Sequence, residues 1–285
     1  FHYYLCRQLK GGGMEIKMKI LALDSSGLVA SVAVVEDDGV NGNLLAEYTV
    51  NYKKTHSQTL LPMLDEIARM IELDLNTIDA IAVAAGPGSF TGLRIGSATA
   101  KGLGLALDKP LVHVPTVDAL AYNLYGTDRV ICPLMDARRN QVYTGIYEFR
   151  NNELSVIEPQ MAVGIDVIAG KLRALGREVI FLGDGVPVFR KTLTEELMQG
   201  MDFSFAPAHL NKQRAGAVAA LAVTYVRAGK AESAAEHRPD YLRPSQAERE
   251  RAEKEAREKA EKEKTQSRME EKTESQAEEK AALHE

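Results

Sequence analysis

The residues best suited to chemistry in this sequence form a glycine-rich segment, Gly86-Pro87-Gly88-Ser89-Phe90-Thr91-Gly92. A Walker A loop needs a Lys-Ser or Lys-Thr pair after its glycines to meet phosphate and magnesium, but Leu93 and Arg94 follow here. A Rossmann fingerprint needs the spacing G-x-G-x-x-G, and the last glycine of this segment comes one residue too late. What remains is a tight strand-to-helix turn, whose helix N-terminus could receive an anion.

The same region carries a stripe of small residues. Gly92, Gly96 and Ala100 recur every four residues, which places them on one face of a predicted helix. A smooth face of this kind lets another helix approach closely. We favour this interpretation over direct contact with a ligand.

A second candidate site is Asp24-Ser25-Ser26-Gly27, which follows a short apolar run. Actin-like and sugar-kinase-like folds use an aspartate between a strand and its hairpin partner to address phosphate and its metal ion. An ordinary β-turn of Asp, Ser and Gly is the alternative. Because no second phosphate loop is present, the sequence predicts at most a vestigial nucleotide site at Asp24, Ser25 and Ser26.

Other catalytic constellations fail on spacing. The histidines contain no pair three or four residues apart, which argues against a zinc site. No G-x-S-x-G segment is present, so the nucleophile elbow of a hydrolase is excluded. His56 opens a predicted helix, where a capping or surface role is favoured over catalysis. Arg138 and Arg139 follow Asp136 and fit an anion site and a hairpin-turn salt bridge equally well.

These residues must be positioned by strands and helices. Short apolar or alternating runs predict strands, and an apolar period near 3.6 predicts helices. The first part of the chain predicts strands at 20–23, 30–35 and 44–50, a helix at 57–72, a strand at 78–85, a helix at 91–107 and a strand at 110–114. A looser version follows, with strands at 129–134, 142–149, 154–158 and 179–182 and helices at 167–175 and 215–228. Asp24 and Asp136 each end a strand and precede a hairpin partner, so we predict two lobes of related topology.

Composition divides the chain further. From Ser245 onward, 13 acidic and 10 basic residues fall within the last 41, and the segment has no apolar stripe. This composition predicts a charged tail that is helical or disordered. We therefore expect an N-terminal extension at 1–17, a first lobe at 18–115, a second lobe at 116–244 and the tail at 245–285. The last helix before the tail, at about 215–229, is a candidate to pack on the first lobe.

Charge and hydrophobicity exclude several classes of protein. The net charge of -5 argues against an autonomous nucleic-acid binder that gains its affinity by neutralising phosphates. No uninterrupted apolar stretch approaches the length of a membrane span. Two cysteines cannot build a disulfide framework, so a reducing cytoplasm is the expected compartment.

Several segments of the chain resemble the bacterial TsaB family, also called YeaZ. They lie between residue 18 and about residue 250, and the glycine-rich one is the most specific. The matching segments are Lys19-Ile20-Leu21-Ala22-Leu23-Asp24-Ser25-Ser26, His56-Ser57-Gln58-Thr59-Leu60-Leu61-Pro62-Met63, Gly86-Pro87-Gly88-Ser89-Phe90-Thr91-Gly92-Leu93-Arg94-Ile95-Gly96, Ala100-Lys101-Gly102-Leu103, Asp136-Ala137-Arg138-Arg139-Asn140-Gln141-Val142-Tyr143 and Tyr241-Leu242-Arg243.

The resemblance implies an α/β, actin-like or sugar-kinase-like ATPase fold with two ribonuclease-H-like lobes. Members of the family are non-catalytic partners of the paralogue TsaD, which makes N6-threonylcarbamoyladenosine at position 37 of tRNA. TsaD carries two metal-binding histidines four residues apart, and in this chain those positions fall on Thr116 and Leu120. Leucine cannot bind a metal and threonine replaces imidazole poorly. The resemblance therefore implies neither a catalytic residue nor a metal here, with ATP and a metal expected on the partner proteins.

The resemblance also implies an interface. TsaB pairs with TsaD through its first lobe, and the helices at 57–72 and 91–107 are the candidates in this chain. The expected interface residues are Leu60, Leu64, Ile67, Ile71, Arg94, Gly96, Ala100 and Leu103. A large side chain at Gly96 is expected to impair complex formation. The other implied partners are TsaE and tRNA, both through the complex, and a second copy of the chain when TsaD is absent.

Two other functions stay open at this stage. Asp24 and Ser25 also suit an independent ATPase or phosphotransferase of the sugar-kinase-like fold, although a second phosphate loop is missing. A glycoprotease-like peptidase is the last alternative, and neither a nucleophile–base pair nor a metal-binding set supports it. Nucleotide turnover by the purified chain would favour the first alternative, and specific proteolysis would favour the second.

Overall fold

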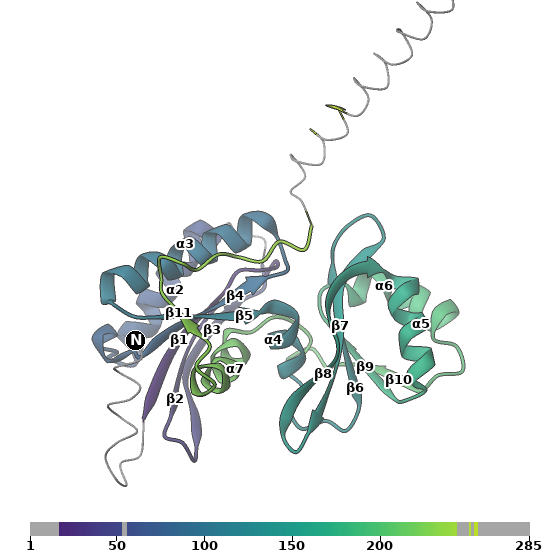
Figure 1. Cartoon of the computed structure of the whole chain (residues 1–285), viewed down its shortest axis with the longest axis horizontal. Coiled ribbons are helices and arrows are strands. Elements are labelled where there is room, and N and C mark those ends of the chain that lie inside the picture. Colours follow the sequence, from purple (N-terminus) through teal and green to yellow (C-terminus); the bar gives the residue numbers. More distant parts are fainter. Residues whose placement is uncertain (1–16, 53–55, 244–250, 252–253, 256–285) are drawn as a thin grey trace, which may run out of the picture. The chain divides into compact units, whose positions relative to one another are not determined.

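The computed structural model describes residues 17–52, 56–243, 251 and 254–255, and this part of the chain is mixed α/β (Figure 1). The described residues up to Leu242 form one compact unit that contains two β-sheets. The expected N-terminal extension, apart from residue 17, and nearly all of the charged tail lie outside the described residues. Of the helices within the described ranges, none is long and apolar enough to cross a membrane.

The first sheet has six strands in the order β11-β5-β4-β1-β2-β3. These strands are β1 Met18–Asp24, β2 Ala30–Asp37, β3 Gly42–Val50, β4 Ala80–Gly86, β5 Leu111–Pro115 and β11 Ala231–Glu232. β2 is antiparallel to both β1 and β3, whereas β4 is parallel to both β1 and β5. β11 closes the edge antiparallel to β5, with Glu232 opposite Leu111.

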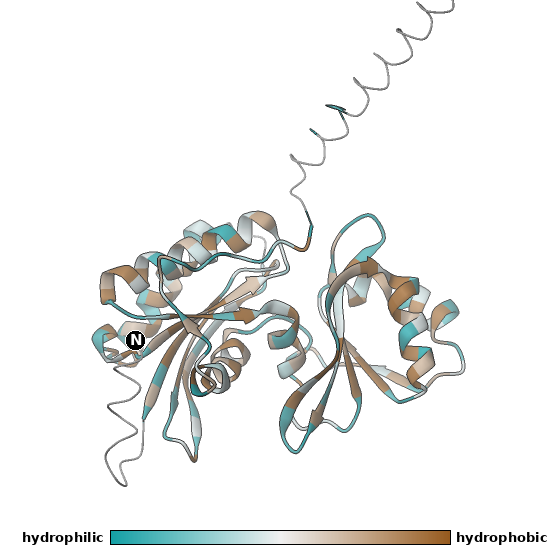
Figure 2. Cartoon of the chain, viewed as in Figure 1, coloured by the Kyte–Doolittle hydropathy of each residue, from teal (hydrophilic) through white to brown (hydrophobic). Residues whose placement is uncertain are grey.

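Helices cover both faces of the first sheet (Figure 1). The helical segments of this part are α2 His56–Met70, η1 Leu75–Thr77, α3 Phe90–Leu107, α4 Thr116–Tyr122 and α7 Ala215–Arg227. Because side chains alternate along a strand, Leu21 and Leu23 pack with α2 on one face, while Ile20 and Ala22 pack with α7 on the other. Burial of both faces explains the continuous apolar runs, which Figure 2 shows in brown along the strands. Pro62 lies in the interior of α2 rather than in its first turn.

The second sheet has five strands in the order β10-β9-β6-β7-β8. These strands are β6 Val130–Asp136, β7 Gln141–Arg150, β8 Glu153–Gly164, β9 Val179–Leu182 and β10 Phe203–Phe205. The accompanying helices are α5 Ile165–Leu175, α6 Val186–Thr192 and the π-helical turn η2 Leu193–Leu197. Their apolar residues pack around Phe181, which is fully buried in the core of this part.

The two sheets repeat one topology. The strand order β3-β2-β1-β4-β5 corresponds to β8-β7-β6-β9-β10, and corresponding neighbours are parallel or antiparallel in the same way. Asp24 and Asp136 are the last residues of the corresponding strands β1 and β6. The predicted α/β, actin-like fold with two ribonuclease-H-like halves is thereby confirmed.

The chain returns to the first sheet after it has completed the second. α7 packs on β1 and β2, and β11 pairs with β5. Ala215 and the residues that follow it in α7 are therefore part of the core beneath the first sheet. The helix expected at about 215–229 as a candidate to pack on the first lobe is α7, and both α7 and β11 contact the first sheet although they follow the second sheet along the chain.

Short elements escape the sequence prediction. α4 has 7 residues, β10 has 3 and β11 has 2, which is too little for a periodic pattern to be recognised. α4 nevertheless connects the two halves. The carboxylate of Asp118 accepts hydrogen bonds from Tyr147 Oη on β7 (2.8 Å) and from Tyr225 Oη on α7 (3.3 Å).

Candidate functional site

The segment Asp24-Ser25-Ser26 forms the turn between β1 and β2, and all three residues are buried. Asp24 Oδ1 accepts hydrogen bonds from Ser26 N (2.9 Å) and Ser26 Oγ (2.6 Å), so the carboxylate closes its own turn. Ser25 Oγ donates to the carbonyl oxygen of Gly92 (2.9 Å) near the start of α3. The predicted nucleotide-site residues thus lie together, with these polar contacts directed to the protein itself.

The glycine-rich turn between β4 and α3 packs directly on this segment. A Cβ atom at Gly88 would collide with the Ser26 carbonyl oxygen, and one at Gly92 would collide with the Ser25 carbonyl oxygen. Ser89 N donates to Ser26 O at 2.7 Å. The glycines therefore permit close packing, as predicted. The element that approaches them is the β1–β2 turn, however, and not another helix.

Two further features of the polar groups at this turn are a raised pKa and buried atoms that lack a hydrogen-bond partner among the described residues. Burial raises the pKa of Asp24 to about 6, and hydrogen bonds from Ser26 offset part of that rise. His56 Nε2 donates to the carbonyl oxygen of Gly27 (2.8 Å), so His56 braces the turn. His56 Nδ1 and both amide atoms of Gln213 are buried with no hydrogen-bond partner among the described residues. No sequence pattern marks Gln213 as a neighbour of this turn, because only tertiary folding brings it to Gly27.

The corresponding turn of the second sheet decides between the two interpretations of Arg138. Arg138 N donates to Asp136 Oδ1 (2.8 Å), and its guanidinium lies 3.2 Å from the Asp136 carboxylate. Asp136 N in turn donates to Asp184 Oδ1 (3.2 Å). Of the two predicted roles for Arg138, the structure supports the hairpin-turn salt bridge.

Most of the predicted interface residues face the interior of the chain. Five are buried, namely Leu60, Leu64, Ile67, Gly96 and Ala100. The apolar stripe of α2 is used to cover the first sheet, as expected for a helix in this position. A Cβ atom at Gly96 would lie 2.5 Å from Ser25 Oγ, so a large residue there would disturb the β1–β2 turn. Burial within the chain leaves these five residues little surface for a partner, while Ile71 and Leu103 are half-buried and Arg94 is exposed.

The opposite face of α3 presents a different stripe. Ala98, Gly102 and Leu105 are exposed on the side that faces away from the sheet. A Cβ atom at Gly102 would meet nothing within 4 Å. Leu61 and Met70 are exposed apolar residues on the neighbouring helix α2. Small residues therefore recur along α3 as predicted, but the stripe that faces solvent is that of Ala98 and Gly102, and not that of Gly92, Gly96 and Ala100.

The two positions that the family resemblance assigns to metal-binding histidines lie in the core. Thr116 is fully buried, and its Oγ1 accepts a hydrogen bond from Gly86 N (3.1 Å). Leu120 is buried in an apolar cluster with Val117 and Ile131. Both side chains therefore serve the packing of α4.

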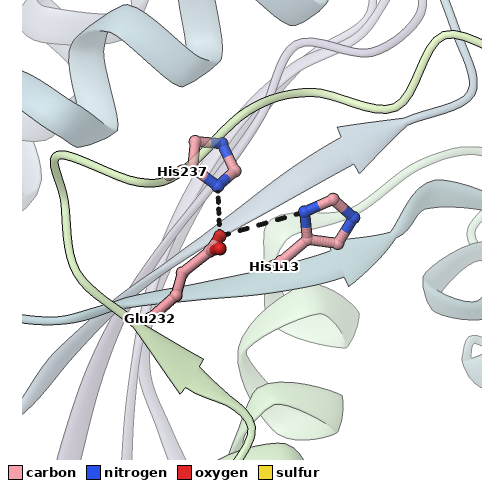
Figure 3. A group of neighbouring side chains, drawn as sticks. All are labelled: His113, Glu232 and His237. Carbon is pink, nitrogen blue, oxygen red and sulfur yellow. Dashed lines mark hydrogen bonds and ion pairs between the residues drawn. The ribbon is translucent and has the colours of Figure 1, made fainter.

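A different group of metal-ligating side chains lies at the edge of the first sheet, where β11 pairs with β5 (Figure 3). His113 is on β5, Glu232 is on β11 and His237 follows β11, and one ligand atom from each lies within 4.8 Å of the others. Glu232 Oε1 is 2.6 Å from His237 Nδ1 and 3.9 Å from His113 Nδ1. The sequence prediction of no metal site rested on histidine pairs at local spacing, whereas here the second histidine, His113, lies far from Glu232 and His237 along the chain.

The two histidines of this cluster have different surroundings. His237 is buried, and burial lowers its pKa although the hydrogen bond to Glu232 acts in the opposite direction. His113 is partly exposed, and its Nε2 donates to Asp240 Oδ2 (2.9 Å). One imidazole is therefore held rigidly in the interior, and the other can be reached from solvent.

Known proteins resemble this chain over most of its length. The family described as "TsaD: tRNA N6-adenosine threonylcarbamoyltransferase" matches residues 43–251. The chain is 35% identical to the tRNA threonylcarbamoyladenosine biosynthesis protein TsaB of Bacillus subtilis over 234 residues, which are 81% of this chain and 96% of that protein. It is 33% identical to TsaB of Escherichia coli over 172 residues, 59% of this chain and 72% of that one. The solved structure of YeaZ from Pseudomonas aeruginosa matches with a TM-score of 0.66 at 27% identity, covering 79% of this chain and all (100%) of that one.

Proposed function

This chain belongs to the TsaB (YeaZ) family, and we propose that it is the non-catalytic subunit that binds and activates TsaD in the cytoplasm. In this role it supports threonylcarbamoyl transfer to N6 of adenosine 37 in tRNAs that read ANN codons. TsaE and tRNA join through the complex. Without TsaD, two copies of the chain pair through the same surface.

The observation that carries the non-catalytic role is the chemistry at Thr116 and Leu120. A metal-dependent transferase needs nitrogen or oxygen ligands that can reach a metal ion, and leucine supplies none. Both residues are buried, and the Thr116 hydroxyl is already engaged with Gly86 N. These positions therefore support a division of labour in which TsaD holds the metal and this chain supplies a protein surface.

The exposed faces of α2 and α3 are the surface that best fits this role. Ala98 and Gly102 leave a smooth strip along α3, and Leu105 adds an apolar side chain to the same side. Small residues let a partner helix approach closely, and exposed apolar side chains gain free energy when they are covered. Leu61 is a further exposed apolar side chain on α2, which contacts α3.

Reconstitution tests the proposed function. TsaD, TsaE, threonylcarbamoyl-adenylate and tRNA are incubated with and without this chain, and modified adenosine is measured. We expect little modification without the chain and full modification with it. Full-rate modification in its absence would refute the proposal. ATP turnover by the purified chain alone would instead support the phosphotransferase alternative.

The interface can be tested with a matched pair of substitutions. Gly102→Trp places a large side chain on the exposed strip of α3, whereas Gly170→Trp does the same on α5, and at both positions a Cβ atom meets nothing within 4 Å. Replacing a helical glycine does not lower helix propensity, so both variants should fold. We expect Gly102→Trp to weaken TsaD binding at least about tenfold and Gly170→Trp to leave it unchanged. Equal binding by both variants would remove the outer face of α3 from the interface.

A further inference from the structure

We propose that His113, Glu232 and His237 form a binding site for a divalent transition-metal ion of the Zn²⁺ type at the β5–β11 edge of the first sheet. Imidazole nitrogen and carboxylate oxygen are ligands that suit zinc. The site uses other residues than Thr116 and Leu120, and it is independent of the proposed role beside TsaD. It holds the segment after β11 against the sheet.

The donor atoms already converge (Figure 3). Each lies within 4.8 Å of the other two, and Glu232 Oε1 lies between the two imidazoles. Zinc bonds of about 2.0–2.2 Å place tetrahedral ligand atoms about 3.4 Å apart, so the 2.6 Å contact between Glu232 and His237 must open and the 3.9 Å gap between Glu232 and His113 must close. His113 and Glu232 are partly exposed and can make this adjustment, while buried His237 provides a fixed point. His237 Nδ1 donates its proton to Glu232 in the metal-free chain, so the bound ion takes the place of that proton, which is released to solvent.

The hydrogen bond of His113 to Asp240 orients it as a ligand. Because the carboxylate of Asp240 accepts the hydrogen bond, Nε2 carries the proton and the neutral ring has its lone pair on Nδ1. That lone pair lies 3.9 Å from the negatively charged Glu232 Oε1, an arrangement that a cation between them would stabilise. A carboxylate that accepts from the second nitrogen of a metal-binding histidine is a common outer-shell feature of zinc sites.

The backbone around the cluster is braced by other parts of the first half. Lys101 Nζ on α3 donates to the carbonyl oxygens of Ala235 and His237, both at 3.0 Å. Asp240 N donates to Ala85 O on β4 at 2.7 Å. Ala234 is buried in the core next to Gly104. The ligand-bearing segment is therefore preorganised, which lowers the entropic cost of binding an ion. The exposed sides of His113 and Glu232 leave room for water as a fourth ligand.

Metal binding is measured on the full chain after treatment with a chelator. Zn²⁺ and Co²⁺ are titrated while calorimetry and the visible spectrum of Co²⁺ are followed, and thermal unfolding is recorded with and without Zn²⁺. We expect one ion per chain at this site. His113→Gln and Glu232→Gln should each weaken binding at least about tenfold, and Asp240→Asn should weaken it about tenfold through the orientation of His113. Zn²⁺ should raise the Tm of the wild type, because an ion that binds only the folded state stabilises it.

His209→Gln is the matched control, since His209 is an exposed histidine outside the cluster and its loss should leave Zn²⁺ affinity unchanged. Histidines in the terminal segments are present in every variant, so they cannot account for a difference between variants. The partly exposed position of His113 makes its variant the safest to fold. Equal Zn²⁺ affinity and an equal Zn²⁺-induced rise in Tm in the wild type, His113→Gln and Glu232→Gln would overturn the proposal.

Discussion

Asp24 is a buried carboxyl group whose pKa is raised to about 6 by desolvation. The unfolded chain releases this proton near the ordinary pKa of about 4, so between about pH 4 and 6 the folded state binds more protons. The stability that the protonated group contributes is therefore present below pH 4 and lost as the pH rises through 6. We expect Asp24→Asn to raise the free energy of unfolding at about pH 7.5 by up to about 3 kcal/mol, since one pKa unit is worth about 1.4 kcal/mol. Urea unfolding of both proteins measures the difference.

The pH dependence supplies the control for Asp24→Asn. Near pH 4 the Asp24 carboxyl is protonated in the folded protein, so the advantage of the variant should disappear there. Asp65→Asn removes an exposed carboxylate that pairs with Arg69, and it should change stability by only a few tenths of a kcal/mol at either pH. A variant that is less stable than the wild type at about pH 7.5 would contradict the conclusion that burial destabilises the ionised Asp24 carboxylate.

At the scale of elements, α7 depends on side chains that belong to the first sheet. Its N-cap residue Arg214 makes no side-chain capping bond. Instead, Gly216 N donates to Glu47 Oε1 (3.2 Å), Ala215 N donates to Ser31 Oγ (2.9 Å), and the Arg214 guanidinium pairs with Glu47. The otherwise unpaired N–H groups at the start of the helix are thus satisfied by β2 and β3. This explains how a helix far along the chain is fixed to the first sheet.

Glu47→Ala removes this connection. We expect the free energy of unfolding to fall by about 2 kcal/mol, because a hydrogen-bonded charge and the substitute cap are lost together. Asn43→Ala, at an exposed position on the same strand, should change stability by less than about 0.5 kcal/mol. Urea unfolding curves of the two variants and the wild type measure these changes in the free energy of unfolding. Equal stability of both would show that Glu47 does not hold α7 in place.

At the scale of the whole molecule, the proposed interface lies on α2 and α3, within the compact unit that ends at Leu242. Removing residues 256–285 should therefore leave TsaD binding and tRNA modification within about twofold of the full chain. Binding measurements on the shortened and full chains test this, with Gly102→Trp as the variant that should lose binding. A tenfold loss on shortening would assign the tail a part in assembly.

Local patterns predicted most of the architecture. Apolar runs and helical periods identified β1 through α3 in order, and the aspartates at 24 and 136 indicated two related halves, which the matching strand orders confirm. These features depend on neighbouring residues, so a single sequence reveals them. Elements of two to seven residues, such as β11 and α4, escaped because they are too short to show a period.

The sequence by itself determined the order of the main strands and helices, the two related halves and the glycine-rich strand-to-helix turn, because each is encoded in the spacing of nearby residues. The family and its fold followed from the resemblance of these segments to known proteins. Only the tertiary structure decided which stripe of α3 faces solvent, since burial of Gly96 depends on contact with Ser25 from another part of the chain. It also decided that His113 meets Glu232 and His237, because the pairing of β11 with β5 closes a long loop between them. Contacts between residues far apart along the chain depend on how sheets and helices pack, and local spacing carries no record of that packing.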